Sequence, residues 1–394
     1  MIPKITFCIP SKSNLRYLKT CIPSIRENAY RNDHDIIVFV DADSDGTVEW
    51  LNSVREEYNL TVYVNPNLNI SLFGIGKAYD YCIANATTDI VMVFHADMML
   101  GKHADYHAFK HLDKGKVVCS TRIEPPLHPN NGEKILMDFG IWPEDFKKDA
   151  FNTYVDGLLT ENAGKTTDGM FAPWMIHKED LLAIGGHDPK LHSAREDSDI
   201  FNRFCLKGYT LIQSWDSLVY HLTGRGGQFQ HGTITADETQ KSEEWKRLMM
   251  NSTKEFMRKW GSNVKHTPLL HPIVTHKYDV IFDIRNIPPQ LLGIVEPMCD
   301  ALNTDLTTEV LHDYISREQQ HTAFDLQSRL FSTKEHDITV SFDATKLTQQ
   351  NFNILQNLTQ ILDESEIEAG MYELDIFSVT VNRVQYYEQE LVHI

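Results

Sequence analysis

Short apolar runs alternate with helix-like patterns between residues 5 and 94, and this alternation constrains the fold more than any other feature of the sequence. The runs cover residues 5–9, 36–40, 60–64 and 90–94 and are rich in β-branched side chains. The segment after the first run carries apolar residues at helical spacing, from Leu15 to Ile25. Strands that alternate with helices of this length form βαβ units, so we expect an α/β fold with a mostly parallel sheet.

The alternation weakens after residue 124, and a helical pattern closes this region at 243–260. We expect a first domain at 1–265, a linker at 266–274 and a smaller C-terminal α/β domain at 275–394, whose role stays open. In the second domain the patterns predict strands at 280–284, 338–342 and 372–384, and helices at 289–302, 307–316 and 347–362.

The net charge of the 394-residue chain is −18, and it is unevenly distributed. Residues 1–270 hold 30 basic and 35 acidic side chains, whereas residues 271–394 hold 7 and 20. An acidic surface repels phosphate backbones, so we expect no nucleic-acid partner. The nearly neutral first domain can still bind an anionic donor. The acidic residues 271–394 could serve acceptor binding, oligomerisation, binding of a basic partner or simply solubility.

The six cysteines are dispersed and form no C-x-x-C pair, which is typical of reduced, buried thiols. The longest apolar runs are far shorter than the ~20 residues of a membrane span. The run at 5–9 is too short for a secretory signal. We therefore expect a cytoplasmic protein with no transmembrane segment.

Carboxylates follow two of the four predicted strands. Asp41 and Asp43 come after the run at 36–40, and His95-Ala96-Asp97 follows the run at 90–94. The carboxyl ends of parallel strands form the ligand-binding edge of such sheets, and carboxylates there suit a divalent cation or a ribose hydroxyl. Each aspartate could instead cap the following helix. Two such positions in one sheet favour a binding site.

A second acidic cluster and a histidine lie further along the chain. Glu196 and Asp197 stand where a helix is predicted to begin; the helix dipole alone favours acids there, but a half-buried carboxylate can also act as a base. His221 opens a glycine-rich loop that contains Arg225, and such a loop can bind phosphate. A lone histidine after a strand is more often structural.

Taken in order, these segments resemble the family 2 glycosyltransferases, which have the GT-A fold. The resemblance covers residues 1 to about 265 and rests on six motifs in the family's order. They are T-F-C-I-P-S at 6–11, V-D-A-D-S-D-G-T at 40–47, G-I-G-K-A at 74–78, H-A-D at 95–97 in place of the family's D-x-D, E-D at 196–197 and F-M-R-K-W-G at 256–261.

The resemblance implies a nucleotide-diphosphate sugar as donor and Mn²⁺ or Mg²⁺ as cofactor. The residues that it assigns to the donor are Pro10, Ser11, Asp41, Asp43, Gly76, Lys77, His95, Ala96, Asp97 and Arg225. The metal ligands that it implies are Asp97, His221 and, where the family has an aspartate, His95. If His95 is a ligand, the mixed nitrogen and oxygen site favours Mn²⁺, because Mg²⁺ prefers oxygen; otherwise Asp97 does most of the binding.

The same resemblance implies the catalytic roles. Asp197 would deprotonate the acceptor hydroxyl for in-line attack with inversion at the anomeric carbon, and Glu196 would orient the acceptor or Asp197. Trp174 is the best candidate for stacking on a carbohydrate acceptor, although a tryptophan in the core is the alternative. We find no Q-x-x-R-W motif of the processive enzymes, so we expect single transfers to a carbohydrate or another hydroxyl acceptor.

Two other functions compete with this interpretation. A non-catalytic nucleotide-sugar-binding or scaffold protein would explain His95 as the mark of a decayed metal site. A sugar-1-phosphate nucleotidyltransferase is less favoured, because that family's G-x-G-[ST]-R turn is replaced here by P-S-K-S-N at 10–14.

Overall fold

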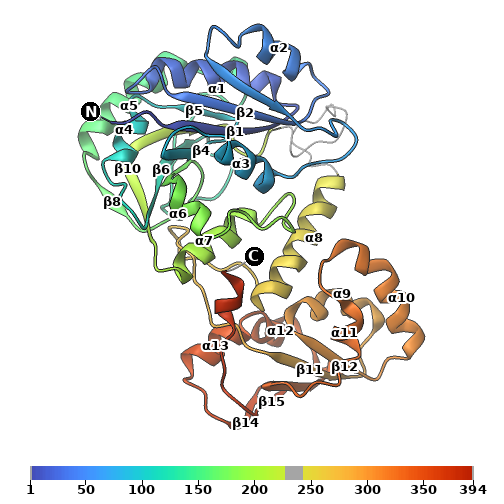
Figure 1. Ribbon diagram of the computed structural model, residues 1–394. Helices are drawn as coiled ribbons and strands as arrows, with labels where there is room; N and C mark the ends of the chain where they lie inside the picture. The colour runs from blue at the N-terminus through green and yellow to red at the C-terminus, as the bar shows by residue number, and fades with distance from the viewer. Residues whose placement is uncertain (1, 227–242, 393–394) are drawn as a thin grey trace. The chain divides into compact units, whose positions relative to one another are not determined.

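The computed structural model describes residues 2–226 and 243–392, and the chain divides into two compact units (Figure 1). Unit 1 comprises Met1–Leu248 and His266–Ile273, and unit 2 comprises Met249–Lys265 and Val274–Ile394. Each unit has its own sheet and its own apolar core.

Unit 1 is built around one sheet in the strand order β3-β2-β1-β4-β9-β6-β10-β5. These strands are β1 (Thr6–Lys12), β2 (Asp35–Ala42), β3 (Leu60–Val64), β4 (Ile90–Val93), β5 (Met98–Leu100), β6 (Lys116–Glu124), β9 (Trp174–His177) and β10 (Thr210–His221), with the short β7 (Ile135–Leu136) and β8 (Thr166–Thr167) paired to β6 and β10. The neighbours of β1, β2 and β3 are parallel, whereas β9 is antiparallel to both β4 and β6. The α/β class expected from the sequence is thus confirmed.

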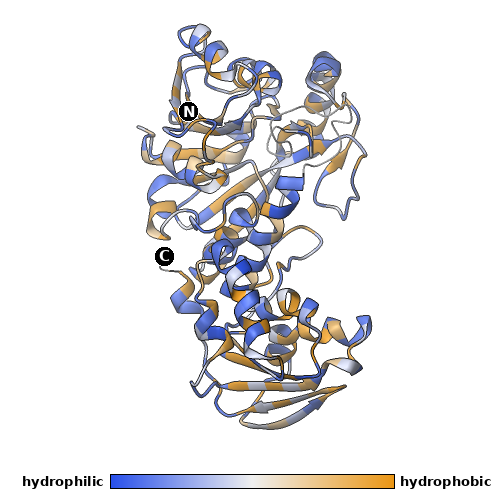
Figure 2. Ribbon diagram, turned by 90° about the vertical axis from the view of Figure 1, so that its right-hand side faces the viewer, coloured by the Kyte–Doolittle hydropathy of each residue, from blue (hydrophilic) through white to orange (hydrophobic). Residues whose placement is uncertain are grey.

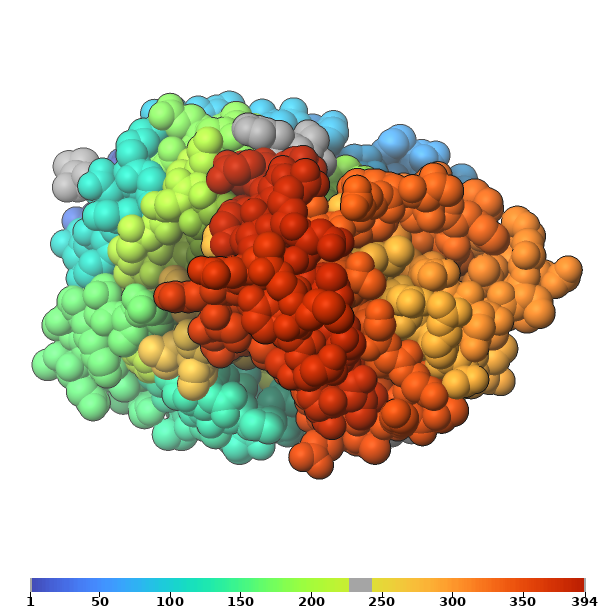
Figure 3. Space-filling view, turned by 90° about the horizontal axis from the view of Figure 1, so that it is seen from below, coloured from blue at the N-terminus to red at the C-terminus, as the bar shows by residue number. Residues whose placement is uncertain are grey.

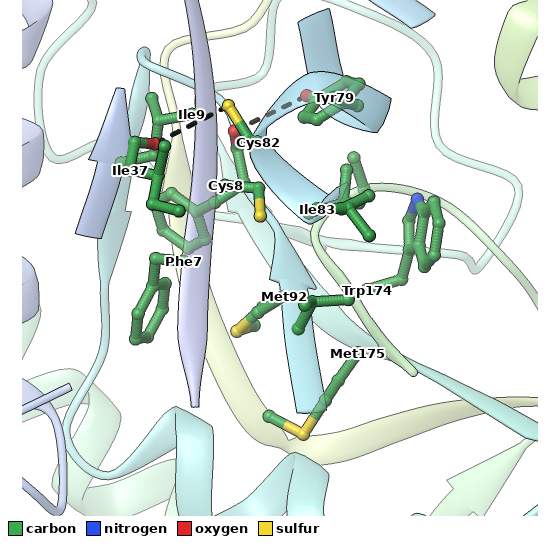
Figure 4. Packing of buried hydrophobic residues seen from close by; sticks show 14 of the residues in the cluster. Phe7, Cys8, Ile9, Ile37, Tyr79, Cys82, Ile83, Met92, Trp174 and Met175 are labelled. Carbon is green, nitrogen blue, oxygen red and sulfur yellow. Dashed lines mark hydrogen bonds between the residues drawn. The ribbon is translucent and has the colours of Figure 1, made fainter. Parts of the chain in front are cut away.

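Helices alternate with these strands along the chain. They are α1 (Leu15–Asn28), α2 (Thr47–Ser53), α3 (Ile75–Ala84), α4 (Ala104–Phe109), α5 (Lys148–Glu161), α6 (Lys178–Ala183) and α7 (Glu196–Leu206). Figure 2 shows mixed blue and orange along the helices, as expected for amphipathic segments that bury one face. The predicted apolar runs at 5–9, 36–40 and 90–94 lie in the core of the sheet, which Figure 4 shows around Phe7, Cys8 and Met92, whereas the run at 60–64 forms the edge strand β3 and buries only Leu60 fully.

Two strands extend beyond their predicted apolar runs. β1 continues through Pro10 to Lys12, and β2 continues through Asp41 to Ala42. The two strands pair in parallel, with Ser11 opposite Val40 and Lys12 opposite Ala42. The first strand was expected to end at residue 9, because Pro10 and a polar stretch follow it. The longer strands bring residues 10–12 and Asp41 to the same edge of the sheet.

Unit 2 contains a sheet in the order β12-β11-β13-β15-β14. Its strands are β11 (Val280–Arg285), β12 (Ala301–Thr304), β13 (Ile338–Asp343), β14 (Gly370–Leu374) and β15 (Phe377–Val381), and its helices are α9 (Leu292–Val295), α10 (Thr308–Glu318), α11 (Leu326–Leu330), α12 (Gln349–Gln356) and α13 (Leu358–Glu364). In Figure 3 the red C-terminal residues form a continuous band across the visible face of this unit.

Three predictions for unit 2 differ from the structure. Residues 301 and 302 were expected to end a helix but belong to β12, because they pair with β11. The helix expected at 347–362 is divided into α12 and α13 at Asn357. The β segment expected at 372–384 is a hairpin of β14 and β15.

The unit boundary also differs from the one expected at residue 265. Helix α8 (Glu243–Trp260) belongs to unit 1 up to Leu248 and to unit 2 from Met249 onwards. Its later turns contribute Met257 to the unit 2 core, and Arg258 pairs with the buried Glu296 at 2.6 Å. The later turns of α8 therefore belong to unit 2 because they pack against its core, although they continue the helix that starts in unit 1.

Within residues 2–226 and 243–392, no helix combines the length and the apolarity that crossing a membrane requires. All six cysteines are free thiols, and Cys205 alone is not fully buried.

Candidate active site

Strand pairing brings His95, Asp97 and His221 together from distant parts of the chain. His95 and Asp97 lie between β4 and β5, and His221 ends β10. β10 is antiparallel to β5, with His221 opposite Met98, and the backbone N–H of Leu222 donates to the carbonyl of Asp97 at 3.0 Å. This ladder fixes His221 beside Asp97.

The three side chains form a cluster of potential metal ligands. One ligand atom of each lies within 4.8 Å of the others. Nε2 of His221 is 3.7 Å from Oδ1 of Asp97, and Asp97 is only 5% exposed. Two imidazoles and one carboxylate form a donor set that fits Mn²⁺ better than Mg²⁺, so the residues present fit the implied cation.

The charge state of this cluster suits metal binding. Burial, together with the charges of His221 and Arg122, lowers the pKa of His95 to about 3, so its ring is neutral and keeps a free lone pair. Burial raises the pKa of Asp97, and the charge of His221 opposes that rise. A bound cation would offset the cost of burying the Asp97 carboxylate.

His221 also contacts Glu124, which ends β6 and is 1% exposed. Nδ1 of His221 lies 2.8 Å from Oε1 of Glu124. Burial alone would raise the pKa of Glu124, but the hydrogen bond with His221 and the charges of His221 and Arg122 outweigh it and hold that pKa well below its usual value. Nothing in the sequence singled out Glu124, because its role depends on the pairing of β6 with β10.

A pocket opens at the carboxyl ends of β1 and β2. Of the residues expected to bind the donor, Pro10, Ser11 and Asp41 line it. The Ser11 hydroxyl is buried and has no hydrogen-bond partner among the described residues, so it is available to a ligand. Asp41 accepts hydrogen bonds from the backbone of Phe73 at 2.6 Å and Gly74 at 3.1 Å, so it also shapes the pocket wall.

The pocket includes residues that were not predicted from the sequence. They are Lys12, Asn14, Leu72, Gly74, Ile75, Ala78, His192, Ser193, Trp245 and Leu248. Lys12 and Asn14 follow the predicted donor motif directly and could have been inferred from their position after the strand. Trp245 could not, because its segment lies far from the donor motif in sequence and only folding brings it to the pocket.

A smaller pocket connects the donor motif to the metal cluster. Its walls include Pro10, Asn14, Ile75, Tyr79, His95, Ala96, Asp97 and Gly226. A side chain at Gly226 would begin 3.4 Å from Oδ2 of Asp97, so the loop after β10 returns to the cluster. Arg225 in that loop lies with its guanidinium carbon 4.8 Å from the centre of the Trp142 ring. Gly227 and Gln228, the rest of the glycine-rich loop, lie outside the described residues.

Asp43, which is expected to help hold the donor, does not line the donor pocket. Its Oδ1 accepts from the backbone of Gly46 and Thr47, both at 2.9 Å, and its Oδ2 accepts from Val48 at 2.9 Å. Burial would raise the pKa of Asp43, but these backbone bonds lower it overall. Asp43 therefore stabilises the start of α2, the alternative raised from the sequence.

Gly76 and Lys77, also expected at the donor, do not line the larger pocket. A side chain at Gly76 would begin 2.8 Å from Cβ of His187 and 3.5 Å from Cβ of Glu196, so the glycine permits α3 to pack closely against the segment leading to α7. Lys77 is half-buried near His192, and burial together with the Lys77 charge lowers the pKa of His192.

Glu196 and Asp197 begin α7 and differ in their surroundings. Oε2 of Glu196 is buried without a hydrogen-bond partner among the described residues. Burial, then the nearby Asp197 charge, raises the pKa of Glu196 to about 8. Oδ1 of Asp197 accepts from the backbone N–H of Ser198 at 2.6 Å. Glu196 is thus a carboxyl group that stays protonated at neutral pH, next to a second carboxylate.

Tyr79 links this acidic pair to the metal cluster. Its ring stacks on His95 at 6.4 Å and on His187 at 5.7 Å between ring centres. Burial and the charges of Glu196 and Asp97 all raise the pKa of Tyr79. Glu196 and Asp97 therefore both lie near the Tyr79 ring.

Trp174 is not at this site, which corrects its expected role in acceptor binding. The residue starts β9, is 2% exposed and packs against Phe201 and Phe204 in the core, where Figure 4 shows it. A buried ring cannot stack on a sugar. The alternative raised from the sequence, a core tryptophan, is the correct one.

Comparison with known proteins identifies the N-terminal segment. Residues 6–166 match the model of glycosyl transferase family 2, and a search of curated proteins gave no match. Similar solved structures include GalNAc-T7 with UDP, GalNAc and Mn²⁺ (12% identity, 55% of this chain, 43% of that chain, TM-score 0.41). A second is S. aureus TarS 1–349, with 14% identity over 66% of this chain and 74% of that chain and a TM-score of 0.40. A third is the mannosyltransferase PcManGT from Pyrobaculum calidifontis with GDP-Man and Mn²⁺, with 17% identity over 70% of this chain and 68% of that chain and a TM-score of 0.45.

The chain spans less than half the length of the GalNAc-T7 chain. The family match stands independently of these structures. It contains Pro10, Ser11, Asp41 and the His95-Ala96-Asp97 segment, whereas Glu196, Asp197 and His221 lie beyond it. Residues 6–166 therefore form a glycosyl transferase family 2 segment, and this segment lies within unit 1, which has a mixed α/β architecture and a mostly parallel sheet.

Proposed function

We propose that unit 1 transfers single sugars from a nucleotide-diphosphate sugar to an acceptor hydroxyl, with the help of a divalent cation. The observation that carries this proposal is the convergence of His95, Asp97 and His221 within 4.8 Å, beside a pocket lined by the family's donor motif. His221 lies outside the matched family segment, so its arrival at the cluster is independent support for the site.

The cation would be held by His95, Asp97 and His221, and Mn²⁺ is the ion that this donor set favours. When bound, it supplies Lewis-acid neutralisation of the charge that develops on the departing nucleotide diphosphate. The chain's own residues hold the donor: the Ser11 hydroxyl and the wall around Asp41 face the pocket. Arg225 would lie near the phosphates.

The acidic pair would handle the acceptor. Asp197 takes the proton of the acceptor hydroxyl as that oxygen attacks the anomeric carbon in line with the leaving diphosphate, which inverts the configuration. Glu196, with its pKa raised to about 8, stays neutral at pH 7 and donates a hydrogen bond that orients the acceptor. A neutral carboxylic acid can donate a hydrogen bond while the neighbouring carboxylate accepts the proton, whereas two carboxylates could only accept.

A screen of nucleotide sugars against thermal unfolding tests this function. With Mn²⁺ present, one donor should raise the melting temperature, since a ligand at 100 times its Kd stabilises by about 2.7 kcal/mol. Without Mn²⁺, or with EDTA, the shift should be lost, and Mg²⁺ should restore it less well than Mn²⁺. The same donor should then release its nucleotide when an acceptor hydroxyl is supplied.

Two results would contradict the proposal in different ways. If no nucleotide sugar raises the melting temperature in the presence of Mn²⁺, the proposed donor site is wrong. A Mn²⁺-dependent shift without turnover on a broad set of acceptors, and without hydrolysis of the donor, would point instead to a protein that binds nucleotide sugars without catalysis.

A further inference from the structure

A buried ionic network contacts Nδ1 of His221, the ring nitrogen that faces away from Asp97, and the function proposed above assigns it no role. Nδ1 of His221 faces Oε1 of Glu124 at 2.8 Å, while Nε2 faces Asp97 at 3.7 Å. The two nitrogens of one ring therefore point to two different carboxylates. Only the Asp97 side belongs to the cluster of potential metal ligands.

Strand pairing fixes the contact between His221 and Glu124. β6 and β10 run in parallel, with Tyr220 opposite Ile123, so the next residues of the two strands lie side by side at the same edge of the sheet. Glu124 is 1% exposed and His221 is 6% exposed. Both side chains are therefore shielded from water.

Two cations hold the Glu124 carboxylate in place. Nη1 of Arg122 donates to its Oε1 at 2.7 Å, and Nζ of Lys134 donates to its Oε2 at 3.0 Å. Arg122 in turn lies over the Phe171 ring, 3.9 Å from its centre. A buried carboxylate with two cationic partners remains ionised, and an ionised carboxylate can only accept hydrogen bonds.

This arrangement selects one form of the His221 ring. Because Glu124 can only accept, Nδ1 of His221 carries the proton that is donated to it, and Nε2 is the ring nitrogen left to face Asp97 and bind a cation. Metal-binding histidines commonly donate their second N–H to a carboxylate, which fixes the ring and makes it a better ligand.

We propose that Glu124 is a positioning residue for the metal site, which it serves by holding His221 with Nε2 free for the cation. The assignment rests on the metal site of the proposed function. It adds a residue from β6, together with Arg122 and Lys134, to a site otherwise formed by the β4–β5 segment and the end of β10.

Titration of the protein with Mn²⁺, followed through the EPR signal of the free ion and without any nucleotide, tests the assignment. Glu124→Gln should weaken Mn²⁺ binding by about 10- to 100-fold, as loss of such a carboxylate typically does. Glu133→Gln is the matched control, because Glu133 is also buried and also near Lys134, at 3.7 Å, but it contacts none of the cluster residues in the described hydrogen bonds and ion pairs. It should bind Mn²⁺ like the wild type.

A second measurement reads the ring directly. In the metal-free wild type, ¹⁵N NMR of labelled histidine should show a proton on Nδ1 of His221, with the signal assigned from a His221→Gln variant, and Glu124→Gln should reduce the protonation of this nitrogen. Glu124→Asp keeps the charge but withdraws the carboxylate by one methylene. It replaces Glu124→Gln in both measurements if the latter does not fold.

The outcomes separate this inference from the proposed function. Wild-type Mn²⁺ binding that Glu124→Gln leaves unchanged would overturn the role of Glu124 and leave the metal site standing, and so would a wild-type His221 whose Nδ1 carries no proton. A wild type that takes up no Mn²⁺ would overturn the metal site and this assignment together.

Discussion

Asp97→Asn is expected to abolish Mn²⁺-dependent sugar transfer while leaving the protein folded. Asp97 is the carboxylate of the cluster, so its replacement removes the negative charge that attracts the cation. Because metal ions contribute several kcal/mol to such reactions, we expect transfer to fall by about 10³-fold or more. The rate of nucleotide release and the affinity for Mn²⁺ are the quantities to measure.

The stability of Asp97→Asn should equal or exceed that of the metal-free wild type. Burial raises the pKa of Asp97, which means that the fold disfavours its charge, and a neutral amide avoids that cost. Asp89→Asn is the matched control, since Asp89 is exposed and precedes the other end of β4. If Asp97→Asn transfers sugar at the wild-type rate, the cluster of His95, Asp97 and His221 has no role in the reaction.

Asp197→Asn is expected to reduce transfer by about 10²- to 10⁴-fold, the usual contribution of a general base. Donor and Mn²⁺ binding should persist, because Asp197 lines neither donor pocket and is not in the metal cluster. Isothermal titration with the donor and a rate assay with the acceptor separate the two effects. If Asp197→Asn keeps the wild-type rate, the base lies elsewhere.

Glu196 gives this second prediction a pH signature. In the wild type, transfer should decline as pH rises past about 8, because Glu196 then loses the proton with which it orients the acceptor. Glu196→Gln keeps a hydrogen-bond donor at this position but cannot ionise, so the decline should disappear. An unchanged alkaline limb in Glu196→Gln would show that another group causes it.

The sign of the effect on stability follows from the same shift. The pKa of Glu196 is about 8 in the folded protein against an ordinary value of 4.5, so the stability linked to its protonation is fully present below 4.5 and is lost as pH rises through 8. Glu196→Gln should therefore be more stable than the wild type at pH 8, and the difference should shrink toward pH 5. Thermal unfolding across this range measures it.

The parallel sheet could be predicted from the sequence because its strands carry local signals. The runs at 36–40 and 90–94 are continuous and apolar, and strands buried on both faces require such runs. The carboxyl ends of those strands then indicated Asp41 and the His95–Asp97 segment, and both lie as predicted at one edge of the sheet.

Residues whose role depends on distant partners could not be predicted in this way. Trp174 is a core residue because β9 inserts antiparallel to β4, with Val93 opposite Trp174, and no local pattern reveals that pairing. Glu124 contacts His221 across 97 positions of sequence. The role of Asp43 could not be decided for another reason: an aspartate that caps a helix and one that binds a ligand occupy the same kind of turn, and only its hydrogen bonds to the start of α2 favour the capping role.

The most direct test of the proposed metal-dependent site is to locate Mn²⁺ in crystals of the protein by anomalous diffraction at the manganese absorption edge. We expect a single strong peak in unit 1, in contact with Nε2 of His221, a carboxylate oxygen of Asp97 and the imidazole of His95, and no peak there in Asp97→Asn. A peak bound elsewhere, or none at the cluster despite saturating Mn²⁺, would contradict the metal site on which the proposed function depends.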